Sequence, residues 1–340
     1  MKSAVFSAPH NMQVKEVEIP SYKDDEILVR VKACGICGTD VECYLGNSIE
    51  GVFPYVPGHE WSGEVSEVGD AVTSLKKGDK VVGQTVEPCG ICDRCKNGMN
   101  PELCRNPRVF GFTPATPGGF SEYSVRKERF LSKLPGNCSF IEGALVEPFS
   151  VAYYGVWVNG GGVQASEDVV ITGLGPIGLF ALAAVKVVGA RTICVDPIER
   201  RRELALNLGA DVVIDPSKKD ATDEILSLTG GFGADLVVDA SGSPSALGKI
   251  VDMADNGGRI SLIGNSFNKT IPVEIWKVVM KGLSIRGSAG SRFQSAIELI
   301  AGRKVDLLSL VSHKFSLPDV GDAFELASKR VESIKILVLP

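Results

Sequence analysis

The chain has 340 residues, of which 44% are hydrophobic and 23% charged, and its formal net charge is −5. This length favours two domains, and the composition is ordinary for a globular protein. The weak acidic charge offers no basic surface for a nucleic-acid backbone, so we expect no nucleic-acid partner.

The nine cysteines do not suggest a disulfide framework, because the chain is long, their number is odd and four of them are spaced for a metal. This pattern favours a reducing, cytoplasmic location. Residues 1–20 lack the positive and apolar regions of a secretory signal. Residues 169–185 are uncharged and apolar, but their glycines and proline favour a strand, a tight turn and a buried helix over a membrane span. We therefore expect no membrane partner.

The first 150 residues are predicted to be β-rich. Residues 27–31 and 80–83 are short apolar runs bounded by turn residues, and glycine and proline recur throughout. No long helical period occurs before about residue 139.

Two short segments of this region carry residues that suit a catalytic metal. Cys37 lies in the Gly-Ile-Cys-Gly-Thr-Asp sequence of residues 35–40, and His59 and Glu60 lie in residues 58–60. A catalytic zinc needs few protein ligands and one open position. Glu60 is interpreted as a ligand or as a group that swings toward the metal. We expect Asp40 to orient His59 through its other ring nitrogen.

Glu147 is a further candidate for the same centre, where it could complete the coordination or hold a water molecule. A second metal site is predicted from four cysteines within sixteen residues, three of which form two consecutive Cys-x-x-Cys pairs: Cys89, Cys92, Cys95 and Cys104. Four thiolates satisfy zinc as a closed structural site, so this ion should not be catalytic.

From residue 168 strands and helices alternate, which predicts a parallel sheet. Six strands are expected, the number of a complete dinucleotide-binding fold, at residues 169–172, 192–195, 212–214, 236–238, 260–263 and 283–285. Helices are expected at residues 179–188, 199–208 and 221–228. After residue 291 we expect a helix at 293–301 and strands at 311–315 and 335–338, which could pack onto the first domain.

A glycine turn joins the first of these strands to a helix. Its predicted cofactor-binding residues are Gly173, Gly175, Pro176, Ile177 and Gly178. The glycines allow a tight turn, close approach of a pyrophosphate and close packing of the helix, whose N-terminus favours negative charge.

Asp196 follows the second strand and could accept hydrogen bonds from both adenosine ribose hydroxyls. Its charge would repel a 2′-phosphate, so NAD is favoured over NADP. Three arginines follow at residues 200–202, where a cation could bind that phosphate instead, but we interpret two of the three as a solvated helix face. Ile263, at the end of the fifth strand, is also assigned to the cofactor site.

The chain closely resembles the zinc-containing medium-chain dehydrogenases, in the alcohol and polyol (sorbitol) dehydrogenase branches. The motifs that carry the resemblance lie at residues 35–40, 58–60, 89–104, 147–148 and 173–178.

The resemblance implies a GroES-like catalytic domain, formed by residues 1–150 and completed by 292–340, and a Rossmann NAD-binding domain at 151–291. It implies a catalytic cleft between them, and dimers or tetramers built through the Rossmann sheets. It also implies two zinc ions per chain, with Cys37, His59 and either Glu60 or Glu147 holding the catalytic one.

Further roles follow from the same resemblance. Thr39 matches the hydroxyl that accepts the substrate proton, and Arg201 matches the residue that packs on the adenosine ribose. Glu42 stands where many members carry a histidine that passes the proton to water, so Glu42 is a candidate for that step.

The expected activity is hydride transfer between NAD and a secondary alcohol on a polyol, sugar or sugar acid. Glu147 supports this substrate class, because simple-alcohol enzymes of the family commonly have cysteine there. Arg292 follows the sixth strand, which borders the cleft in the family, and could bind hydroxyls or a carboxylate. The alternatives are a threonine or simple-alcohol dehydrogenase, a zinc-independent quinone reductase, and a zinc-stabilised nucleotide-binding protein without activity.

Overall fold

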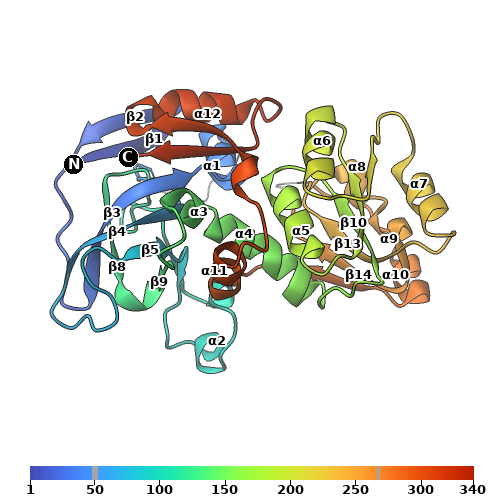
Figure 1. Cartoon of the computed structure of the whole chain (residues 1–340), viewed down its shortest axis with the longest axis horizontal. Coiled ribbons are helices and arrows are strands. Elements are labelled where there is room, and N and C mark those ends of the chain that lie inside the picture. The colour runs from blue at the N-terminus through green and yellow to red at the C-terminus, as the bar shows by residue number, and fades with distance from the viewer. Residues whose placement is uncertain (48–52, 266–268) are drawn as a thin grey trace. The chain divides into compact units, whose positions relative to one another are not determined.

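The computed structural model describes residues 1–47, 53–265 and 269–340 (Figure 1). The chain divides into two compact units. Unit 1 consists of Met1–Pro148, Phe293–Arg303 and Leu307–Pro340, and unit 2 of Phe149–Arg292 and Lys304–Asp306. Each unit has its own sheet and its own hydrophobic core.

Unit 2 is built on a six-stranded sheet in which every neighbouring pair is parallel. Its strands are β10 (Asp168–Thr172), β11 (Arg191–Val195), β12 (Val212–Ile214), β13 (Ala234–Asp239), β14 (Ala254–Leu262) and β15 (Ser284–Gly287). They lie in the order β12-β11-β10-β13-β14-β15, so the chain order reverses between β10 and β13. The predicted doubly wound α/β fold with six strands is confirmed.

Helices cover both faces of this sheet, which explains why its central strands are apolar without alternation. They are α5 (Pro176–Lys186), α6 (Glu199–Asn207), α7 (Ala221–Leu228), α8 (Pro244–Leu247), α9 (Ile250–Met253) and α10 (Ile275–Lys281). Figure 1 shows α5 and α6 on one side of β10 and β13, and α9 and α10 on the other. A π-helical segment, η3 (Tyr154–Asn159), continues α4 (Val146–Tyr153).

Unit 1 is β-rich, as predicted. Its main sheet has seven strands, β16 (Val311–Ser316), β17 (Lys335–Leu339), β3 (Glu26–Gly35), β4 (Glu60–Val68), β5 (Lys80–Gly83) and β9 (Leu131–Lys133) in spatial order, with β8 (Tyr123–Lys127) paired to β3. All pairs are antiparallel except β16–β17. Two smaller pairs are β1 (Lys2–Ala8) with β2 (Asn11–Glu16), and β6 (Val86–Glu87) with β7 (Arg108–Val109).

Short helices connect the strands of unit 1. They are α1 (Gly38–Tyr44), α2 (Asp93–Lys96), α3 (Phe140–Ala144), α11 (Phe293–Ala301), α12 (Val320–Ser328) and the 3₁₀ turns η1 (Pro101–Leu103), η2 (Glu128–Phe130), η4 (Leu308–Leu310) and η5 (Leu317–Asp319). The C-terminal strand β17 pairs with β3 through Leu337 and Val338. This pairing brings the end of the chain to the strand that precedes α1.

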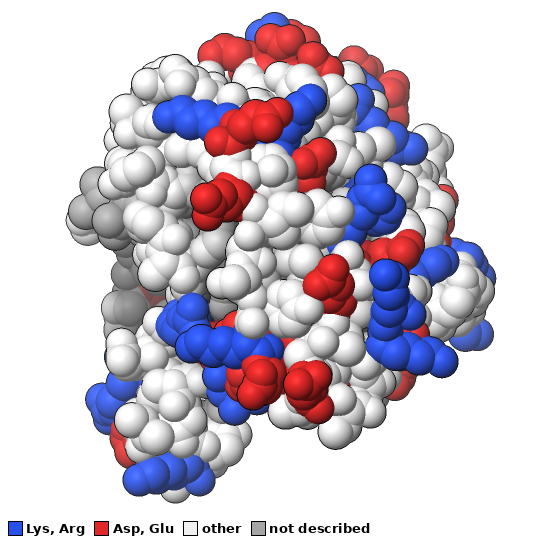
Figure 2. All heavy atoms as spheres, turned by 90° about the vertical axis from the view of Figure 1, so that its left-hand side faces the viewer, with Lys and Arg blue, Asp and Glu red and all other residues white. Residues whose placement is uncertain are grey.

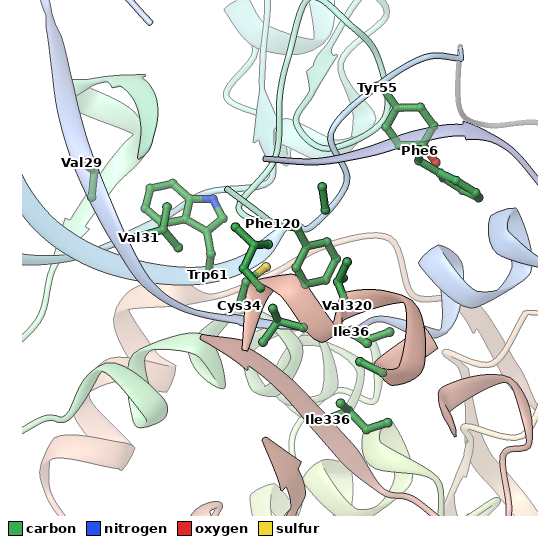
Figure 3. Packing of buried hydrophobic residues seen from close by; sticks show 14 of the residues in the cluster. Phe6, Val29, Val31, Cys34, Ile36, Tyr55, Trp61, Phe120, Val320 and Ile336 are labelled. Atoms are coloured by element: carbon green, nitrogen blue, oxygen red, sulfur yellow. The ribbon is translucent and has the colours of Figure 1, made fainter. Parts of the chain in front are cut away.

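The core of unit 1 surrounds the last residues of β3. Figure 3 shows Trp61, Phe120 and Ile336 packed around Cys34 and Ile36. Cys34 is completely buried, and burial raises the pKa of its thiol well above the usual range. The end of β3 is therefore held rigidly, directly before Cys37.

Charged side chains of both signs are interspersed on the face of the molecule drawn in Figure 2, and no continuous basic area covers it. Among the described residues, no helix has the length and apolar character needed to cross a membrane.

Candidate active site and metal centres

Three potential metal ligands converge in unit 1. Cys37 is the N-cap residue of α1, His59 directly precedes β4, and Glu60 is the first residue of β4. One ligand atom from each lies within 4.8 Å of the other two. Gly35 pairs with Glu60 across β3 and β4, and this register brings the two segments together.

His59 is buried and held on two sides. Its Nδ1 lies 3.8 Å from Oδ1 of Asp40, and its ring stacks on Phe112 with centroids 5.2 Å apart. The other oxygen of Asp40 accepts a hydrogen bond from the backbone N–H of Cys37, at 3.1 Å. Asp40 thus links the orientation of His59 to the start of α1, which leaves Nε2 of His59 as the nitrogen for a metal.

Gly58, directly before His59, has a φ of +99°, which L side chains rarely adopt. A Cβ there would lie 2.7 Å from Sγ of Cys34 and 2.9 Å from the backbone nitrogen of Phe120. Only glycine therefore allows the chain to enter β4 with His59 in this position.

Glu60 is buried and forms an ion pair with Lys335 of β17, which is also buried. The Lys335 ammonium donates a second hydrogen bond to the carbonyl of Ile36, at 3.0 Å. A Cβ on Gly35 would lie 2.9 Å from Cε of Lys335, so the missing side chain makes room for this pair.

Glu147, near the start of α4, is 9% exposed and accepts a hydrogen bond from the hydroxyl of Thr85 at 3.1 Å. Glu147 does not belong to the set of ligand atoms within 4.8 Å, whereas Glu60 does. Burial raises the pKa of Glu147 to about 7, and the charge of Glu60 adds to this effect. Both glutamates therefore belong to one electrostatic centre.

Four acidic side chains of this centre, Cys37, Asp40, Glu60 and Glu147, surround two basic ones, His59 and Lys335. Burial would lower the pKa of His59, but Cys37 and Asp40 outweigh it and raise that pKa well above its usual value. Burial likewise opposes the charged form of Lys335, but Glu60 and Cys37 raise its pKa. Buried anions of this kind normally pair or coordinate a metal.

The donor set fits a zinc ion. Sulfur, imidazole nitrogen and carboxylate oxygen are the ligands of catalytic zinc sites. In the described part of the chain, Nδ1 of His59 and Oδ1 of Asp40 have no hydrogen-bond partner, although buried polar atoms are usually paired. A cation bound to His59 would favour donation from Nδ1 to Asp40, which would satisfy both atoms.

Thr39 and Glu42 lie one helical turn apart on α1. The Thr39 hydroxyl oxygen is 3.8 Å from Sγ of Cys37, so Thr39 belongs to the same centre. Glu42 forms an ion pair with Arg330, which follows α12. The structure thus gives the Glu42 carboxylate a fixed partner that its sequence neighbours did not indicate.

The four remaining candidate ligands, Cys89, Cys92, Cys95 and Cys104, form a second cluster in unit 1. Sulfur–sulfur distances are 3.9 Å for Cys89–Cys95, 3.4 Å for Cys92–Cys95, 3.9 Å for Cys92–Cys104 and 3.6 Å for Cys95–Cys104. Four sulfurs about 2.3 Å from a tetrahedral zinc would be about 3.8 Å apart. The cluster therefore has the dimensions of a closed zinc site.

Backbone groups support this cluster. The N–H groups of Cys89 and Asn106 donate to Sγ of Cys104 at 3.2 and 3.4 Å. Backbone hydrogen bonds from Arg105 and Cys95 lower the pKa of Cys92 to about 6, so its thiolate is available as a ligand. Together these contacts favour negative charge on the sulfurs.

The glycine turn lies in unit 2, between β10 and α5. Gly173 has a φ of +85°, and a Cβ there would lie 2.6 Å from Cα of Ser241. Gly175 is the N-cap residue of α5, Pro176 and Ile177 are its first residues, and Gly178 packs against the carbonyl of Gly173. The turn therefore has the close packing expected of a dinucleotide-binding βα unit.

A cavity of about 560 Å³ adjoins this turn, lined among others by Gly173, Gly175, Asp196 and Arg201. Asp196 is buried, and its two oxygens accept hydrogen bonds from the backbone N–H groups of Leu174 at 2.7 Å and Ile198 at 2.8 Å. The carboxylate is thus fixed at the cavity wall, with lone pairs left for further donors.

The three arginines differ from one another. Arg200 is exposed, while Arg201 lies 3.6 Å from Asp196 and lines the cavity. The interpretation of two arginines as a solvated face is wrong for Arg202, which is buried. Arg202 donates to the Asp196 carbonyl at 2.7 Å and pairs with Asp215 at 3.0 Å. It turns inward because α6 packs against β12 on that side.

Ile263 and Arg292 do not line the cavity. Ile263 follows β14 and packs against Gly155 of the π-helical segment, where there is no room for a Cβ. Arg292 is exposed at the end of unit 2, and its guanidinium lies 5.3 Å from the centre of the Tyr154 ring. Both residues lie beyond the carboxyl ends of parallel strands, where ligands of such sheets bind.

Lys335 and Thr85 were not identified from the sequence. The lysine interrupts an apolar run at residues 334–338. This pattern could have indicated a buried ion pair, because a lysine inside a buried strand needs a partner of opposite charge. Thr85 carries no comparable signal. Its role depends on a contact with a residue 62 positions away.

Comparisons with known proteins agree with this geometry. Residues 23–136 match the alcohol dehydrogenase GroES-like domain, and residues 176–302 match the zinc-binding dehydrogenase domain. The chain is 33% identical to sorbitol dehydrogenase of Bacillus subtilis, covering 100% of this chain and 97% of the relative. It is 36% identical to L-threonine 3-dehydrogenase of Caldanaerobacter subterraneus, covering 92% and 91%.

A third relative, 2-dehydro-3-deoxy-L-galactonate 5-dehydrogenase of Pseudoalteromonas atlantica, is 35% identical over 99% of this chain and 98% of its own length. A Sinorhizobium meliloti structure bound to NADP superposes with a TM-score of 0.93 at 29% identity, covering 100% of this chain and 99% of the other. An Escherichia coli alcohol dehydrogenase complexed with NADH has a TM-score of 0.92 at 31% identity, with the same coverage.

Identity of this extent along the whole chain, two matching domains and two clusters with the ligand types of zinc lead to one conclusion. The chain belongs to the family of zinc-containing medium-chain alcohol and polyol dehydrogenases.

Proposed function

We propose that the protein is a zinc-dependent NAD(H) oxidoreductase that interconverts a secondary alcohol and its ketone, with the alcohol on a polyol, sugar or sugar acid. The observation that carries the proposal is the convergence of Cys37, His59 and Glu60 in a chain that also has a glycine turn followed by Asp196. A protein that only bound a nucleotide would not need the metal-ligand cluster of Cys37, His59 and Glu60.

We assign the parts as follows. Unit 1 is the catalytic domain, and its two clusters bind one catalytic and one structural zinc ion. Unit 2 is the NAD-binding domain. Cys37 and His59 are the constant ligands of the catalytic ion, and the third is Glu60 or Glu147.

Bound in these sites, zinc supplies stabilisation of negative charge on an alcohol oxygen, and the dinucleotide supplies a hydride acceptor. The Thr39 hydroxyl, 3.8 Å from the Cys37 sulfur, is proposed to take the alcohol proton. Glu42, one turn further along α1, is its proposed next acceptor. Asp40 keeps His59 in one orientation during these proton transfers.

NAD is the proposed cofactor because Asp196 presents a buried, fixed carboxylate where a 2′-phosphate would lie. Arg201 pairs with that carboxylate, which reduces the cation's capacity to bind phosphate. In the same proposal, Arg201 packs on the adenosine ribose.

Two features favour a polyhydroxy substrate. The buried Glu147 beside the zinc ligands offers an acceptor for a second hydroxyl, and Arg292 offers exposed donors for a hydroxyl or carboxylate. Relatives that act on sorbitol and on a sugar acid support this class. Threonine is the second candidate, favoured by the 36% identity to a threonine dehydrogenase.

A substrate screen tests the proposal. Polyols, aldonates, threonine and simple alcohols are each offered with NAD and with NADP, and absorbance of the reduced cofactor is followed. The expected result is fastest turnover of a polyol or sugar acid with NAD. Turnover restricted to threonine would replace the substrate class, and no turnover of any alcohol would favour a binding protein.

The site assignment is tested by Cys37→Ser. We expect two zinc ions per native chain, one in the variant, and loss of at least about a thousandfold in kcat/KM, because the ion supplies the charge stabilisation. Zinc is measured by elemental analysis. Cys138→Ser, which changes a buried cysteine outside both clusters, is the matched control and should keep both ions. Full turnover by Cys37→Ser would contradict the assignment.

A further inference from the structure

Arg126, on β8, is a buried arginine that has no acidic partner among the described residues. It is 2% exposed, and its guanidinium donates to the Ser124 hydroxyl at 2.8 Å and to the carbonyls of Val125 and Pro117 at 2.9 and 3.3 Å. Burial lowers the pKa of Arg126 to about 9. The cation is thus removed from water without the counter-charge that buried charges usually have.

Two aromatic rings lie beside the guanidinium. Its carbon Cζ is 3.5 Å from the centre of the Phe110 ring and 5.2 Å from the centre of the Trp61 ring. A planar guanidinium is attracted to aromatic faces and stacks on them. Trp61, labelled in Figure 3, directly follows Glu60 on β4, and Phe110 directly follows β7. Arg126 therefore joins three segments: β8, β4 and the chain after β7.

The chain after β7, residues 110–120, packs against the residues that lead into β4. The Gly119 N–H donates to the Gly58 carbonyl at 2.6 Å, directly before His59. Within the same loop, the Phe112 ring stacks on the imidazole of His59 with centroids 5.2 Å apart. The 110–120 loop therefore covers one face of a proposed metal ligand.

Arg126 contacts the 110–120 loop at two points. It stacks on the Phe110 ring, where the loop begins, and it donates to the Pro117 carbonyl near the end of the loop. Phe112 lies between these two points in the chain. The guanidinium thus fixes, relative to β8 and β4, the part of the loop that carries the ring on His59.

Stability alone does not require an arginine in this place. Even a buried ion pair can often be replaced by well-packed apolar side chains without loss of stability, and a buried cation without a counter-charge is more costly. Methionine would fill much of the same space, but it offers neither a planar stack nor an N–H for the Pro117 carbonyl. What the arginine adds is a defined orientation of the loop.

We propose that Arg126 is a positioning residue that holds the 110–120 loop against His59 and so limits the orientations of the imidazole at the catalytic ion. It acts through Phe112, the residue of the loop that stacks on His59. The inference rests on the proposed function, because it requires zinc at Cys37 and His59.

The test measures release of zinc to a chelator from the intact protein, with thermal unfolding and turnover in parallel. Arg126→Met should unfold within a few degrees of the native chain. Its catalytic zinc should leave about tenfold faster, the usual effect of loosening the support of a ligand, and kcat should fall by a similar factor. Arg126→Lys keeps the charge but not the planar stack, so it should release zinc as fast as Arg126→Met.

A double variant shows whether Arg126 acts through the ring on His59. Phe112→Ala removes that ring and should by itself speed release of the catalytic zinc. Arg126→Met combined with Phe112→Ala should release it no faster than Phe112→Ala alone, because the connection is already broken. If Arg126→Met does not fold, Phe110→Leu removes the stacking ring from the loop and carries the same expectations.

Two controls accompany these variants. Arg129→Met removes an exposed arginine of the same unit whose guanidinium lies 4.8 Å from the centre of the Phe130 ring, and it should leave zinc release and turnover unchanged. Cys37→Ser identifies which phase of release belongs to the catalytic ion. The zinc of the four-cysteine cluster should leave all Arg126 variants at the native rate.

Native release of zinc from folded Arg126→Met or Arg126→Lys overturns the inference. A large fall in unfolding temperature, faster loss of both ions, or additive effects of the Arg126 and Phe112 changes would show a general loosening of unit 1 and overturn it as well. If the native chain holds no zinc that Cys37→Ser removes, the proposed function fails together with the inference. If it holds that zinc and only the predicted effects of Arg126 are absent, the inference alone fails.

Discussion

Cys37, His59 and Asp196 each lie at the end of a strand or directly beside one. Cys37 follows β3, His59 precedes β4, and Asp196 follows β11. At these points the backbone leaves the sheet, and side chains can face a ligand while the strand keeps them in place. The residue types and local motifs were enough to predict these positions as candidate metal or dinucleotide ligands, and their function stays a prediction.

Asp196→Asn tests cofactor choice at this scale. The substitution keeps the shape of the side chain but removes the charge that would repel a 2′-phosphate. We expect the preference for NAD over NADP in kcat/KM to fall about tenfold, which corresponds to about 1.4 kcal/mol. The measurement is steady-state kinetics with both cofactors.

The matched control for this change is Asp211→Asn. Asp211 also accepts a backbone N–H, from Thr192 at 2.8 Å, but does not line the cavity. Asp211→Asn should leave the ratio of kcat/KM with NAD to kcat/KM with NADP unchanged. An unaltered ratio in Asp196→Asn would show that another group selects the cofactor.

At the scale of elements, boundaries were predicted well where the signals are local. The helices at residues 221–228 and 293–301 have the predicted limits, and each predicted strand of the parallel sheet overlaps an observed one. β14 begins earlier than predicted, at Ala254, because its first residues Asp255–Gly257 are polar or glycine and carry no apolar run. Hydrophobic periodicity and turn residues predict that a strand or helix exists. They do not show how far pairing with a neighbouring strand extends it.

The N-terminus of α3 gives a pH-dependent prediction. Glu142 accepts hydrogen bonds from the backbone and hydroxyl of Ser139 at 2.7 and 2.8 Å, and it pairs with Arg303. Burial opposes its charge, but these donors outweigh burial and lower the pKa of Glu142 below 4.5. Its stabilisation is therefore complete above pH 4.5 and is lost as the pH falls through the lowered value.

We expect Glu142→Gln to reduce the free energy of unfolding by about 1 kcal/mol near pH 7, the usual effect of a lost cap. The difference from the native chain should shrink as the pH falls below 4.5 and through the lowered pKa, because Glu142 then becomes protonated and is neutral like glutamine. Thermal unfolding from pH 3 to 7 measures this. Glu298→Gln, on the exposed side of α11, should show no such convergence, and a constant difference for Glu142→Gln would contradict the prediction.

The loop with four cysteines gives a second prediction at this scale. It contains only the short segments α2 and η1, so its order should depend on the ion. Cys104→Ser should lower the zinc content by one ion per chain and make trypsin cleave several-fold faster at Arg94, Lys96 and Arg105. The main sheet of unit 1 should remain folded. Equal protease resistance in the variant and the Cys138→Ser control would show that the ion does not order the loop.

At the scale of the whole molecule, the weak net charge and the mixed charges of Figure 2 agree with a protein that acts on small molecules. Five exposed large apolar side chains lie on α10 and the edge strand β15: Ile275, Trp276, Val279, Met280 and Ile285. A dimer or tetramer built through the sheets, as the family resemblance implies, would cover them.

Met280→Glu tests this expectation. Met280 is 77% exposed, so the change should not disturb folding, but a charge in an apolar interface should shift the assembly toward monomers. Molar mass by light scattering gives the result. Phe232→Glu alters an equally prominent apolar residue elsewhere on unit 2 and should keep the native mass. Assembly that survives Met280→Glu would place the interface on another surface.

The amino-acid sequence alone was sufficient to predict the fold class, the cluster of four cysteines and the glycine turn. It was also sufficient to predict that Cys37 and His59 lie together. These depend on spacings of a few residues, where covalent geometry leaves few arrangements. It was not sufficient for the pairing of Glu60 with Lys335, of Glu42 with Arg330, or for the burial of Arg202. The first two join residues more than 270 positions apart, and the third depends on how α6 packs on the sheet. Such contacts arise only when strands and helices assemble, because burial and charge pairing are properties of the packed chain and not of its local pattern.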